Sequence, residues 1–351
     1  MQVDSQTVSH PFRVLRGVRQ GDPLSPILFN NVTRVIFAKL KKEWARKKYG
    51  IMVCAREDGL DRPTHCAFAD DTTLLAKSKT TLLRMLRDVK QALAEHGLNL
   101  NLDKCTIQCC RQDWQRQRIE LDGICMPVVD PSVGFKILGT KFTLRGRTSA
   151  ELRSRIAAGW AKFHQMKPLL CRNDGLLDKR LRMFDSTVGQ SVLWCSESWI
   201  VTKEEKRLLT TAQNCMLRKI AGPRRAPDED WVTWVQRSTR IARERALKCK
   251  VRLWADAHLK AKWTWAGHVQ RMQSDRLAVR ATVWRDSEWW RTELLLPRSL
   301  RITRPCRTRW FRWEDDLKRY AKHCGWACWQ ESAANREVWL KHRDAFAAFA
   351  R

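Results

Sequence analysis

The 351-residue sequence lacks several features that would assign it to a common class of protein. No stretch approaches about 18 consecutive apolar residues, which excludes a transmembrane helix. The segment Met1–His10 has no apolar core, so no secretory signal is expected. Repeats and low-complexity tracts are absent, and tyrosine occurs only 2 times. We therefore expect an intracellular protein, in the nucleus or the cytoplasm.

Acidic residues are scarce relative to basic ones. The chain has 37 Asp and Glu against 67 Lys and Arg, which gives a formal net charge of +30. A compact chain with this excess repels itself unless a polyanion neutralises it. Nucleic acid is the commonest such partner, and an anionic membrane is the second. The basic residues are spread among tryptophans and acids rather than along one amphipathic helix, which disfavours the membrane.

The sequence does contain enough apolar material for a folded core. Hydrophobic residues make up 44% of the chain, so wholesale disorder is not expected. The 13 cysteines are odd in number and scattered, which indicates reduced thiols. Tryptophan is frequent, with 18 residues, and most of them follow residue 230. The length predicts two or three compact units.

The strongest chemical signal is Phe68-Ala69-Asp70-Asp71, which lies between two apolar runs and predicts two buried strands joined by a tight turn. Carboxylates about 4 Å apart repel by roughly 1 kcal/mol in water and about 4 kcal/mol at an effective dielectric constant near 20. A hard divalent cation removes this repulsion, and two such ions can hold the attacking and leaving oxygens of a phosphoryl transfer. An isolated Asp-Asp pair can equally be an ordinary polar turn.

A second candidate site is the turn-rich segment 16–26. Gly21 has no Cβ, so a base or sugar can approach its backbone closely. Gln20 offers both a hydrogen-bond donor and an acceptor, and Arg16 and Arg19 suit phosphates. The simpler alternative is a rigid helix entry. Both interpretations can hold together, because a rigid entry would position the loop.

A helix is expected at the end of that segment, with Ser25 as its cap and Pro26 at its first position. The helix ends in the basic segment 41–48, which is compatible with nuclear import but more simply explained as a solvated helix end. Its core-facing residues recur at helical spacing: Leu28, Val32, Val35 and Ile36.

Further elements follow from similar patterns. A helix is predicted from Lys79 to His96, with Gly97 at its end, and strands are predicted at 98–102 and 135–142. Helical periods occur in three more regions: 146–222, 241–265 and 310–320. The first of these regions has an apolar face formed by Ile156, Trp160, Phe163 and Met166.

Taken together, these motifs resemble the palm of reverse transcriptases of the non-LTR (LINE-type) retrotransposon kind. The segment 16–26 resembles the loop and helix that contact nucleotide and template in that family, and 68–71 resembles its catalytic Asp-Asp box. Residues 97–104 resemble the next motif, and 137–139 resemble the primer-grip hairpin. The order and spacing agree over roughly residues 12–142.

The resemblance implies an RNA-directed DNA polymerase, a nucleotidyltransferase that uses Mg²⁺. In this family Asp70 would be the principal metal ligand and Asp71 would assist it. Lys104 matches a lysine that helps the departing pyrophosphate, although an ordinary surface lysine is an equal alternative. The implied partners are an RNA template, a DNA primer or target, and deoxynucleoside triphosphates. The residues that would contact template or nucleotide are Arg16, Arg19, Gln20 and Gly21.

The implied fold is α+β: a partial right-hand polymerase palm followed by helical regions. We expect the partial palm over residues 1–145 and a helical, thumb-like region over 146–222. A basic helical region rich in Trp and Arg would follow over 223–351. The segment 222–227 contains Gly and Pro at the expected boundary.

Two parts of the family's polymerase are not recognisable in this sequence. They are a metal-binding Asp on a strand well before the loop, and the fingers that hold template and nucleotide. The segment 1–17 is too short for either, and the neighbours of its acid, Asp4, do not resemble that motif. Positioning and charge stabilisation supply most of phosphoryl-transfer catalysis. We therefore expect no polymerisation by this chain alone, and the alternative function is a non-catalytic RNA- or DNA-binding remnant.

The C-terminal region carries weaker resemblances to LINE-type proteins, at 265–272 and 304–316. Interleaved Arg and Trp suit single-stranded nucleic acid, because Arg meets phosphates and Trp stacks on bases. Tryptophans at helical spacing, such as Trp310 and Trp313, belong more often to a core. The better candidates for nucleic-acid contacts are Arg307, Arg309 and Arg312.

Two other clusters in this region are not expected to be sites. Asp315 and Asp316 lie in a helical pattern without flanking strands, so a second catalytic pair is disfavoured. The spacing of His323, Cys324 and Cys328 does not complete a four-ligand zinc pattern.

Overall fold

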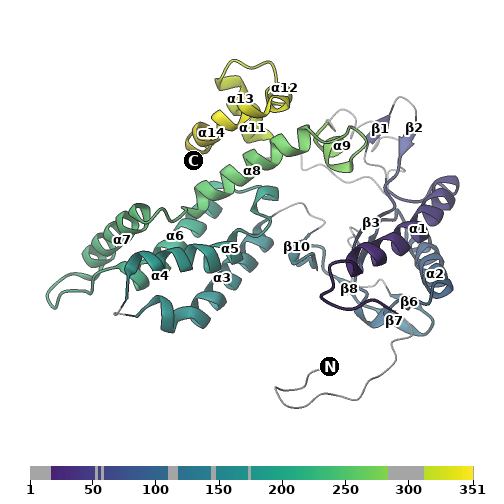
Figure 1. Cartoon of the computed structure of the whole chain (residues 1–351), viewed down its shortest axis with the longest axis horizontal. Coiled ribbons are helices and arrows are strands. Elements are labelled where there is room, and N and C mark those ends of the chain that lie inside the picture. The colour runs from purple at the N-terminus through teal and green to yellow at the C-terminus, as the bar shows by residue number, and fades with distance from the viewer. Residues whose placement is uncertain are drawn as a thin grey trace, which may run out of the picture. The chain divides into compact units, whose positions relative to one another are not determined.

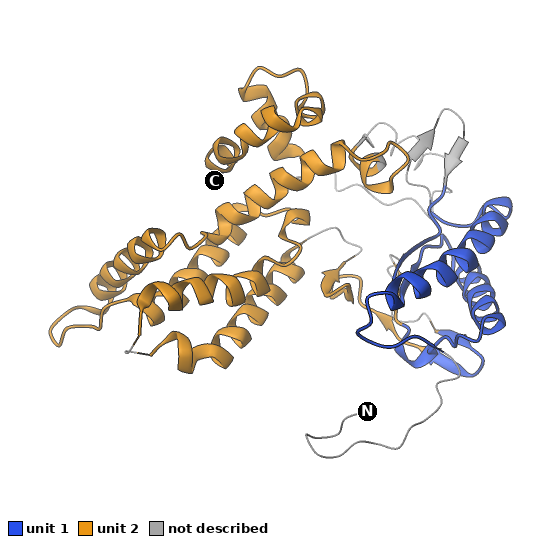
Figure 2. Cartoon of the chain, in the orientation of Figure 1, with its two compact units in different colours: residues 1–105, 119–125 blue, residues 106–118, 126–351 orange. Residues whose placement is uncertain are grey.

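The computed structural model describes residues 17–51, 54–56, 59–109, 118–143, 148–172, 175–283 and 312–350. Three predicted site residues lie outside the described residues: Arg16, Arg307 and Arg309. The chain divides into two compact units, coloured separately in Figure 2. Unit 1 comprises residues 1–105 and 119–125, and unit 2 comprises residues 106–118 and 126–351.

Unit 1 combines helices with short strands (Figure 1). Its helices are α1 (Ser25–Arg46), α2 (Lys79–Glu95) and the 3₁₀ turn η1 (Leu102–Lys104). Its strands are β1 (Cys54–Arg56), β2 (Gly59–Asp61), β3 (His65–Phe68), β4 (Asp71–Leu74), β6 (Ile119–Leu121) and β7 (Ile124–Met126).

Unit 2 is mainly helical. Its strands are β5 (Ile107–Gln108), β8 (Val128–Val129), β9 (Phe135–Ile137) and β10 (Thr140–Phe142). Its long helices are α3 (Ser149–Leu170), α6 (Lys203–Ala221), α7 (Trp231–Lys248) and α8 (Trp254–Gln270). The shorter ones are α4 (Leu177–Phe184), the π-helix η3 (Asp185–Gly189), α5 (Gln190–Leu193), η4 (Ser196–Ser198), α9 (Leu277–Val283), α11 (Asp315–His323), α12 (Trp329–Ala334), α13 (Arg336–Lys341) and α14 (Arg343–Ala350).

The described strands pair only two by two. The pairs are β1–β2, β3–β4, β5–β8, β6–β7 and β9–β10. The β3–β4 and β9–β10 pairs are antiparallel hairpins, whereas β5 and β8 pair in parallel. The predicted α+β class is confirmed, with helices as the larger part.

The core of unit 1 lies between α1 and α2. Seven buried residues form it: Ile36, Phe37, Leu40, Trp44, Met85, Val89 and Ala92. The Trp44 indole donates a hydrogen bond to Asp88 at 2.9 Å, which satisfies the polar atom of a fully buried ring. The predicted helix 79–96 is confirmed as α2, with Ser78 as its cap and Gly97 at φ +72° after its end.

The predicted core face of α1 is largely wrong. Of the four residues, Ile36 is buried at 2% exposure, but Leu28, Val32 and Val35 are 46%, 41% and 61% exposed. Leu28 and Val32 belong to the same row, spaced by four residues, as Ile36, Leu40 and Trp44. The large apolar residues of α1 that are buried against α2 all lie in the second half of the helix, from Ile36 to Trp44. The periodicity found the helix but not which part of its apolar row is covered.

Ser25 does not cap α1 as predicted. The cap position is Leu24, and Ser25 already lies inside the helix, with Pro26 as its next residue. The Ser25 hydroxyl donates to the Arg19 carbonyl at 2.6 Å, and the Asp22 carboxylate accepts from the Leu24 backbone at 2.8 Å. These bonds fold the preceding loop against the helix start instead.

The predicted strand at 98–102 is also wrong. The Asn101 side chain accepts from the backbone N–H groups of Asp103 and Lys104, at 3.1 and 3.3 Å. Such local side-chain bonds favour a turn over an extended strand, and the chain forms η1 there. The predicted strand at 135–142 becomes two strands, because the turn residues Leu138 and Gly139 have φ of +49° and +77°.

Unit 2 has two core clusters that share α8. Trp254 at the start of α8 belongs to a cluster with α3, α4 and α6, and Trp263 belongs to a cluster with α11 to α14. The predicted helical face of 146–222 is confirmed, because Phe163 is fully buried and its three partners pack against the first cluster. The predicted helical stretch 241–265 is two helices, separated by residues 249–253.

Two stacked tryptophans fix the second cluster. The rings of Trp263 and Trp339 lie 3.5 Å apart at an interplanar angle of 5°. Each indole N–H donates to the carbonyl of the other residue, at 2.7 and 2.8 Å. A Cβ on Gly267 would meet the Trp339 ring at 2.5 Å, so this glycine makes room for the stack. The segment 265–272 thus has a packing role.

No helix in the described part of the chain is both long and apolar enough to span a bilayer.

Candidate active site

The Asp-Asp pair lies at the tip of the β3–β4 hairpin. Phe68 pairs with Asp71 across the hairpin, and Ala69 and Asp70 form the turn between them. Ala69 has φ +51°, a left-handed conformation that two-residue hairpin turns require. The predicted arrangement of strand, tight turn and strand is therefore confirmed.

The predicted burial of these strands is wrong. Cys66, Ala67 and Phe68 are exposed on β3, and Asp71 and Thr72 are exposed on β4. The hairpin pairs with no third strand among the described residues. Its base packs on the core of unit 1, where His65 stacks on Phe37 and Leu74 contacts the cluster between α1 and α2, but its tip is exposed. Both carboxylates face solvent, where their mutual repulsion is weak.

The Gln-Gly loop precedes α1 in the same unit. Arg19, Gln20 and Gly21 are all exposed. Gly21 has φ +93°, and no atom lies within 4 Å of the position that a Cβ would take. The backbone conformation requires glycine here, and the space above it is open. Ser25 and Asp22 brace the loop, as described above, so its backbone is held in one shape.

Lys104 is exposed at the end of η1, also in unit 1. Unit 1 therefore contains Lys104, the loop and the carboxylate pair. Within the described residues no hydrogen bond or ion pair joins these three parts to one another.

The donor type of the hairpin fits a divalent cation. Asp70 and Asp71 supply carboxylate oxygens, and Mg²⁺ is usually held by one or two carboxylates together with water and substrate phosphates. The described residues contain no group of three or more His, Cys, Asp or Glu that could enclose a metal. The pair can therefore hold an ion only together with other donors, such as nucleotide phosphates.

The C-terminal acids have structural partners. Asp316 is buried and pairs with the fully buried Lys262 at 3.1 Å, and it also bonds Arg319. Asp315 accepts from the backbone N–H of Arg312 at 2.8 Å, at the start of α11. These positions agree with the expectation that the two acids are not a second catalytic pair.

The predicted core role of the tryptophans at helical spacing is confirmed for Trp313, which is half-buried against the second cluster. Its indole donates to the Glu197 carbonyl at 2.7 Å. Trp310 lies outside the described residues, as do two of the three arginines predicted to contact nucleic acid. Arg312 is described and is partly buried.

The predicted primer-grip segment forms a hairpin that side chains of the helical unit hold. Buried Glu151 on α3 accepts from the Lys141 backbone and from Arg155. Arg155 also donates to the Gly139 carbonyl, and the Trp194 indole donates to the Leu138 carbonyl at 3.3 Å. Sequence reasoning missed Glu151 and Arg155, although their spacing of four residues was a signal of a helical pair.

Comparison with known proteins agrees with the motifs. The family described as reverse transcriptase (RNA-dependent DNA polymerase) matches residues 2–142. A transposon-derived protein of Caenorhabditis elegans is 25% identical over 286 residues, which cover 79% of this chain and 94% of that protein. The Pol polyprotein of the retrotransposable element R2DM of Drosophila melanogaster is 34% identical over 146 residues. That of the R2 element of Nasonia vitripennis is 38% identical over 93 residues.

The matches to the two Pol polyproteins are partial. They cover 40% and 26% of this chain, and only 13% and 8% of those proteins. Residues 2–142 define a reverse transcriptase segment, carrying the Gln-Gly loop and the Asp-Asp hairpin. Over this segment the chain is similar to the Pol polyproteins of R2 retrotransposable elements, which supports a reverse transcriptase of the non-LTR retrotransposon kind.

Proposed function

We propose that the chain is the RNA-directed DNA polymerase region of a non-LTR retrotransposon, with Asp70 and Asp71 as its metal-binding pair. The observation that carries the proposal is the hairpin tip, where a left-handed Ala69 brings two adjacent acids to an exposed turn. The family match covers both this hairpin and the loop at Gln20. By resemblance, residues 1–145 would be part of a palm and 146–222 a thumb-like region.

In this proposal each residue has a role in binding the metal ions, the nucleotide or the template. The bound Mg²⁺ ions would stabilise charge on the nucleotide phosphates and on the attacking and leaving oxygens. Asp70 would be the principal ligand and Asp71 would assist. The open backbone at Gly21 would let a base or ribose approach, while Gln20 would offer a donor and an acceptor to its edge. Arg19 and Lys104 would lie against phosphates.

We test this site by nucleotide binding to the full chain in the presence of an RNA template annealed to a DNA primer. Mg²⁺ should increase the affinity for a complementary deoxynucleoside triphosphate, and Asp70→Asn should abolish that increase. Asp103→Asn is the matched control, because Asp103 is an exposed acid of the same unit. If Mg²⁺ increases the nucleotide affinity equally in the wild type and in Asp70→Asn, Asp70 does not bind the metal.

We also propose that this 351-residue chain does not extend a primer on its own. The described residues offer two carboxylates at the hairpin, with no group of three donors around a metal. Two carboxylates alone would not fix the metal ions firmly. Most of the negative charge that develops during phosphoryl transfer would then not be stabilised. In a primer-extension assay the chain and its Asp70→Asn variant should give the same background, and extension that requires Asp70 would contradict this proposal.

Nucleic-acid binding without catalysis is the second candidate function. It is favoured by the formal charge of +30, which persists whether or not the carboxylate pair is active. The three C-terminal arginines Arg307, Arg309 and Arg312 remain candidates for such contacts. A chain that binds RNA with a steep salt dependence but shows no Mg²⁺-dependent nucleotide binding would have this function alone.

A further inference from the structure

The outward side of α1 carries basic side chains that the carboxylate site does not use. Between residues 34 and 48 the only acid is Glu43, and the basic residues are Arg34, Lys39, Lys41, Lys42, Arg46, Lys47 and Lys48. Arg34, Lys42 and Arg46 are separated by multiples of four residues, so they form a slanted row that turns by about 120° around the helix axis from its first residue to its last. At 1.5 Å per residue this row is about 18 Å long.

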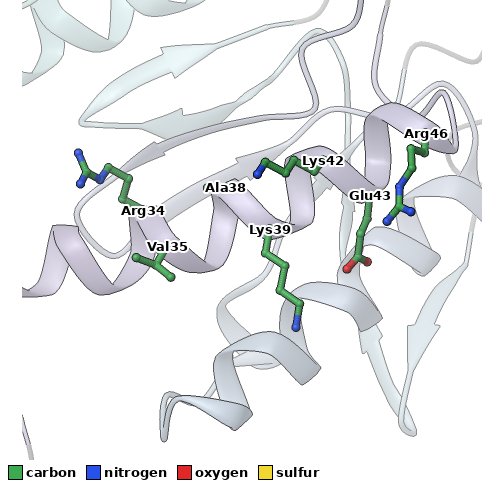
Figure 3. A pocket seen from close by; sticks show the side chains of 7 residues that line it. All are labelled: Arg34, Val35, Ala38, Lys39, Lys42, Glu43 and Arg46. Carbon is green, nitrogen blue, oxygen red and sulfur yellow. The ribbon is translucent and has the colours of Figure 1, made fainter.

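A shallow groove follows this row along the helix (Figure 3). The three basic residues line it together with Val35, Ala38, Lys39 and one acid, Glu43. Figure 3 shows Arg34 and Lys42 directed to one side of the helix, and Lys39, Glu43 and Arg46 directed to the other. Four basic side chains against one acid leave the lining with a net positive charge. The small side chain of Ala38 leaves a gap in the row, so a ligand can come close to the helix there.

The row is not neutralised by the rest of unit 1. Within the described residues no acidic side chain lies within 4 Å of Arg34, Lys42 or Arg46. The neighbouring ion pairs are weak, since Lys39 lies 3.9 Å from the exposed Glu95. The buried side of α1 packs on α2. The basic side chains are therefore not needed for the packing of α1 on α2.

We propose that the groove along α1 binds the phosphate backbone of an RNA strand, independently of base sequence. Cations that extend over about 18 Å along the helix fit a chain of phosphates better than a single anion. The apolar lining of the groove is only Val35 and Ala38, which is too little to insert into a bilayer. RNA is chosen because the proposal rests on the proposed function, in which the chain holds an RNA template.

The test measures the binding of a fluorescent, mixed-sequence single-stranded RNA to the full chain at several salt concentrations. The variant Lys42→Gln/Arg46→Gln should reduce the slope of log K against log salt by about 1.4, since each phosphate contact on a single strand contributes about 0.7. At 0.1 M salt this corresponds to a loss of affinity of about 25-fold. A circular-dichroism melt confirms that the variant is folded.

The matched control is Arg84→Gln/Arg87→Gln, which removes two exposed charges from α2 in the same unit. It should leave the slope nearly unchanged. An equal loss in both double variants would mean that only the overall charge matters, and an unchanged slope in Lys42→Gln/Arg46→Gln would mean that the groove makes no contact. Either result overturns the proposal.

Two further measurements separate this proposal from its alternatives. If Lys42→Gln/Arg46→Gln loses binding to vesicles containing phosphatidylserine but keeps its RNA affinity, the groove is a membrane contact and the proposal fails. Asp70→Asn should keep the wild-type salt slope. If Asp70→Asn also leaves Mg²⁺-dependent nucleotide binding intact, the proposed polymerase site fails while the RNA groove stands.

Discussion

The two units of this chain differ in the size of their cores. Unit 2 fully buries several large side chains, including Trp254, Trp263 and Trp339, although it leaves others such as Leu176 and Trp231 exposed. Unit 1 has a small core between two helices and leaves Phe68 and Val35 more than 60% exposed. Exposed apolar residues in the first half of α1 and at the hairpin tip are typical of surfaces that contact other groups. The candidate site lies in unit 1, the unit with the smaller core.

The largest effect that this comparison predicts is at the tryptophan stack of unit 2. Trp339→Ala should lower the free energy of unfolding of unit 2 by about 3–5 kcal/mol, because it leaves a cavity and removes the hydrogen bond from the Trp339 indole to the Trp263 carbonyl. Trp231→Ala is the control, since Trp231 is 58% exposed, and its cost should stay within about 0.5 kcal/mol. Denaturant unfolding followed by hydrogen exchange of each unit measures both.

A second large effect is predicted at the buried ion pair of unit 2. Asp316→Ala leaves Lys262 buried without its partner, and breaking such a pair costs roughly 3–5 kcal/mol. Burial lowers the pKa of Lys262, and Asp316 opposes that shift. Asp344→Ala removes a comparable but exposed pair with Lys260 and should cost about 1 kcal/mol or less. Similar unfolding curves for the two variants would contradict the buried assignment.

Acid should destabilise unit 2 through His258. Burial, together with the nearby Lys262, lowers the pKa of this histidine to about 4, and its Nδ1 lies 2.7 Å from the Ser196 carbonyl. Because the unfolded chain takes up the proton first, the stability from neutral His258 is complete above about pH 6.5 and is lost as pH falls toward 4. The loss is about 3 kcal/mol. Unfolding free energies at pH 7 and pH 4 should differ less in His258→Gln than in the wild type, and an equal difference would contradict this.

The smallest effect is predicted on the exposed side of α1. Val35→Ala should change stability by no more than about 0.5 kcal/mol, because Val35 is 61% exposed. The neighbouring Ile36→Ala should cost about 2–5 kcal/mol, because Ile36 is buried against α2. Thermal melts of the two variants compare the two sides of one helix. A large loss in Val35→Ala would show that this side is covered.

The sequence predicted best what depends on neighbouring residues. The Asp-Asp hairpin and the helix 79–96 follow from local turn and cap signals, and the structure contains both. The strand at 98–102 failed because one side chain, Asn101, bonds the backbone of the next turn. The predicted core face of α1 was largely wrong because its apolar row continues from Leu28 to Trp44, and only the position of α2 decides that the second half is buried.

The candidate site shows the same division. Sequence alone indicated the acids at Asp70 and Asp71 and the glycine at the loop, and their backbone conformations agree with those indications. It did not predict that the hairpin is exposed, because exposure depends on which other strands pair with it. It also treated the basic end of α1 as a solvated helix end, although the spacing of Arg34, Lys42 and Arg46 already indicated a continuous row.

The most direct measurement is a Mn²⁺ titration of the full chain by electron paramagnetic resonance, with template, primer and a nucleotide present. If the acids at the hairpin tip hold the ion, the double variant Asp70→Asn/Asp71→Asn should lose the tight Mn²⁺ signal that the wild type and Asp103→Asn both show. An identical titration in all three proteins would mean that the hairpin does not bind metal, and the polymerase assignment of this site would be wrong.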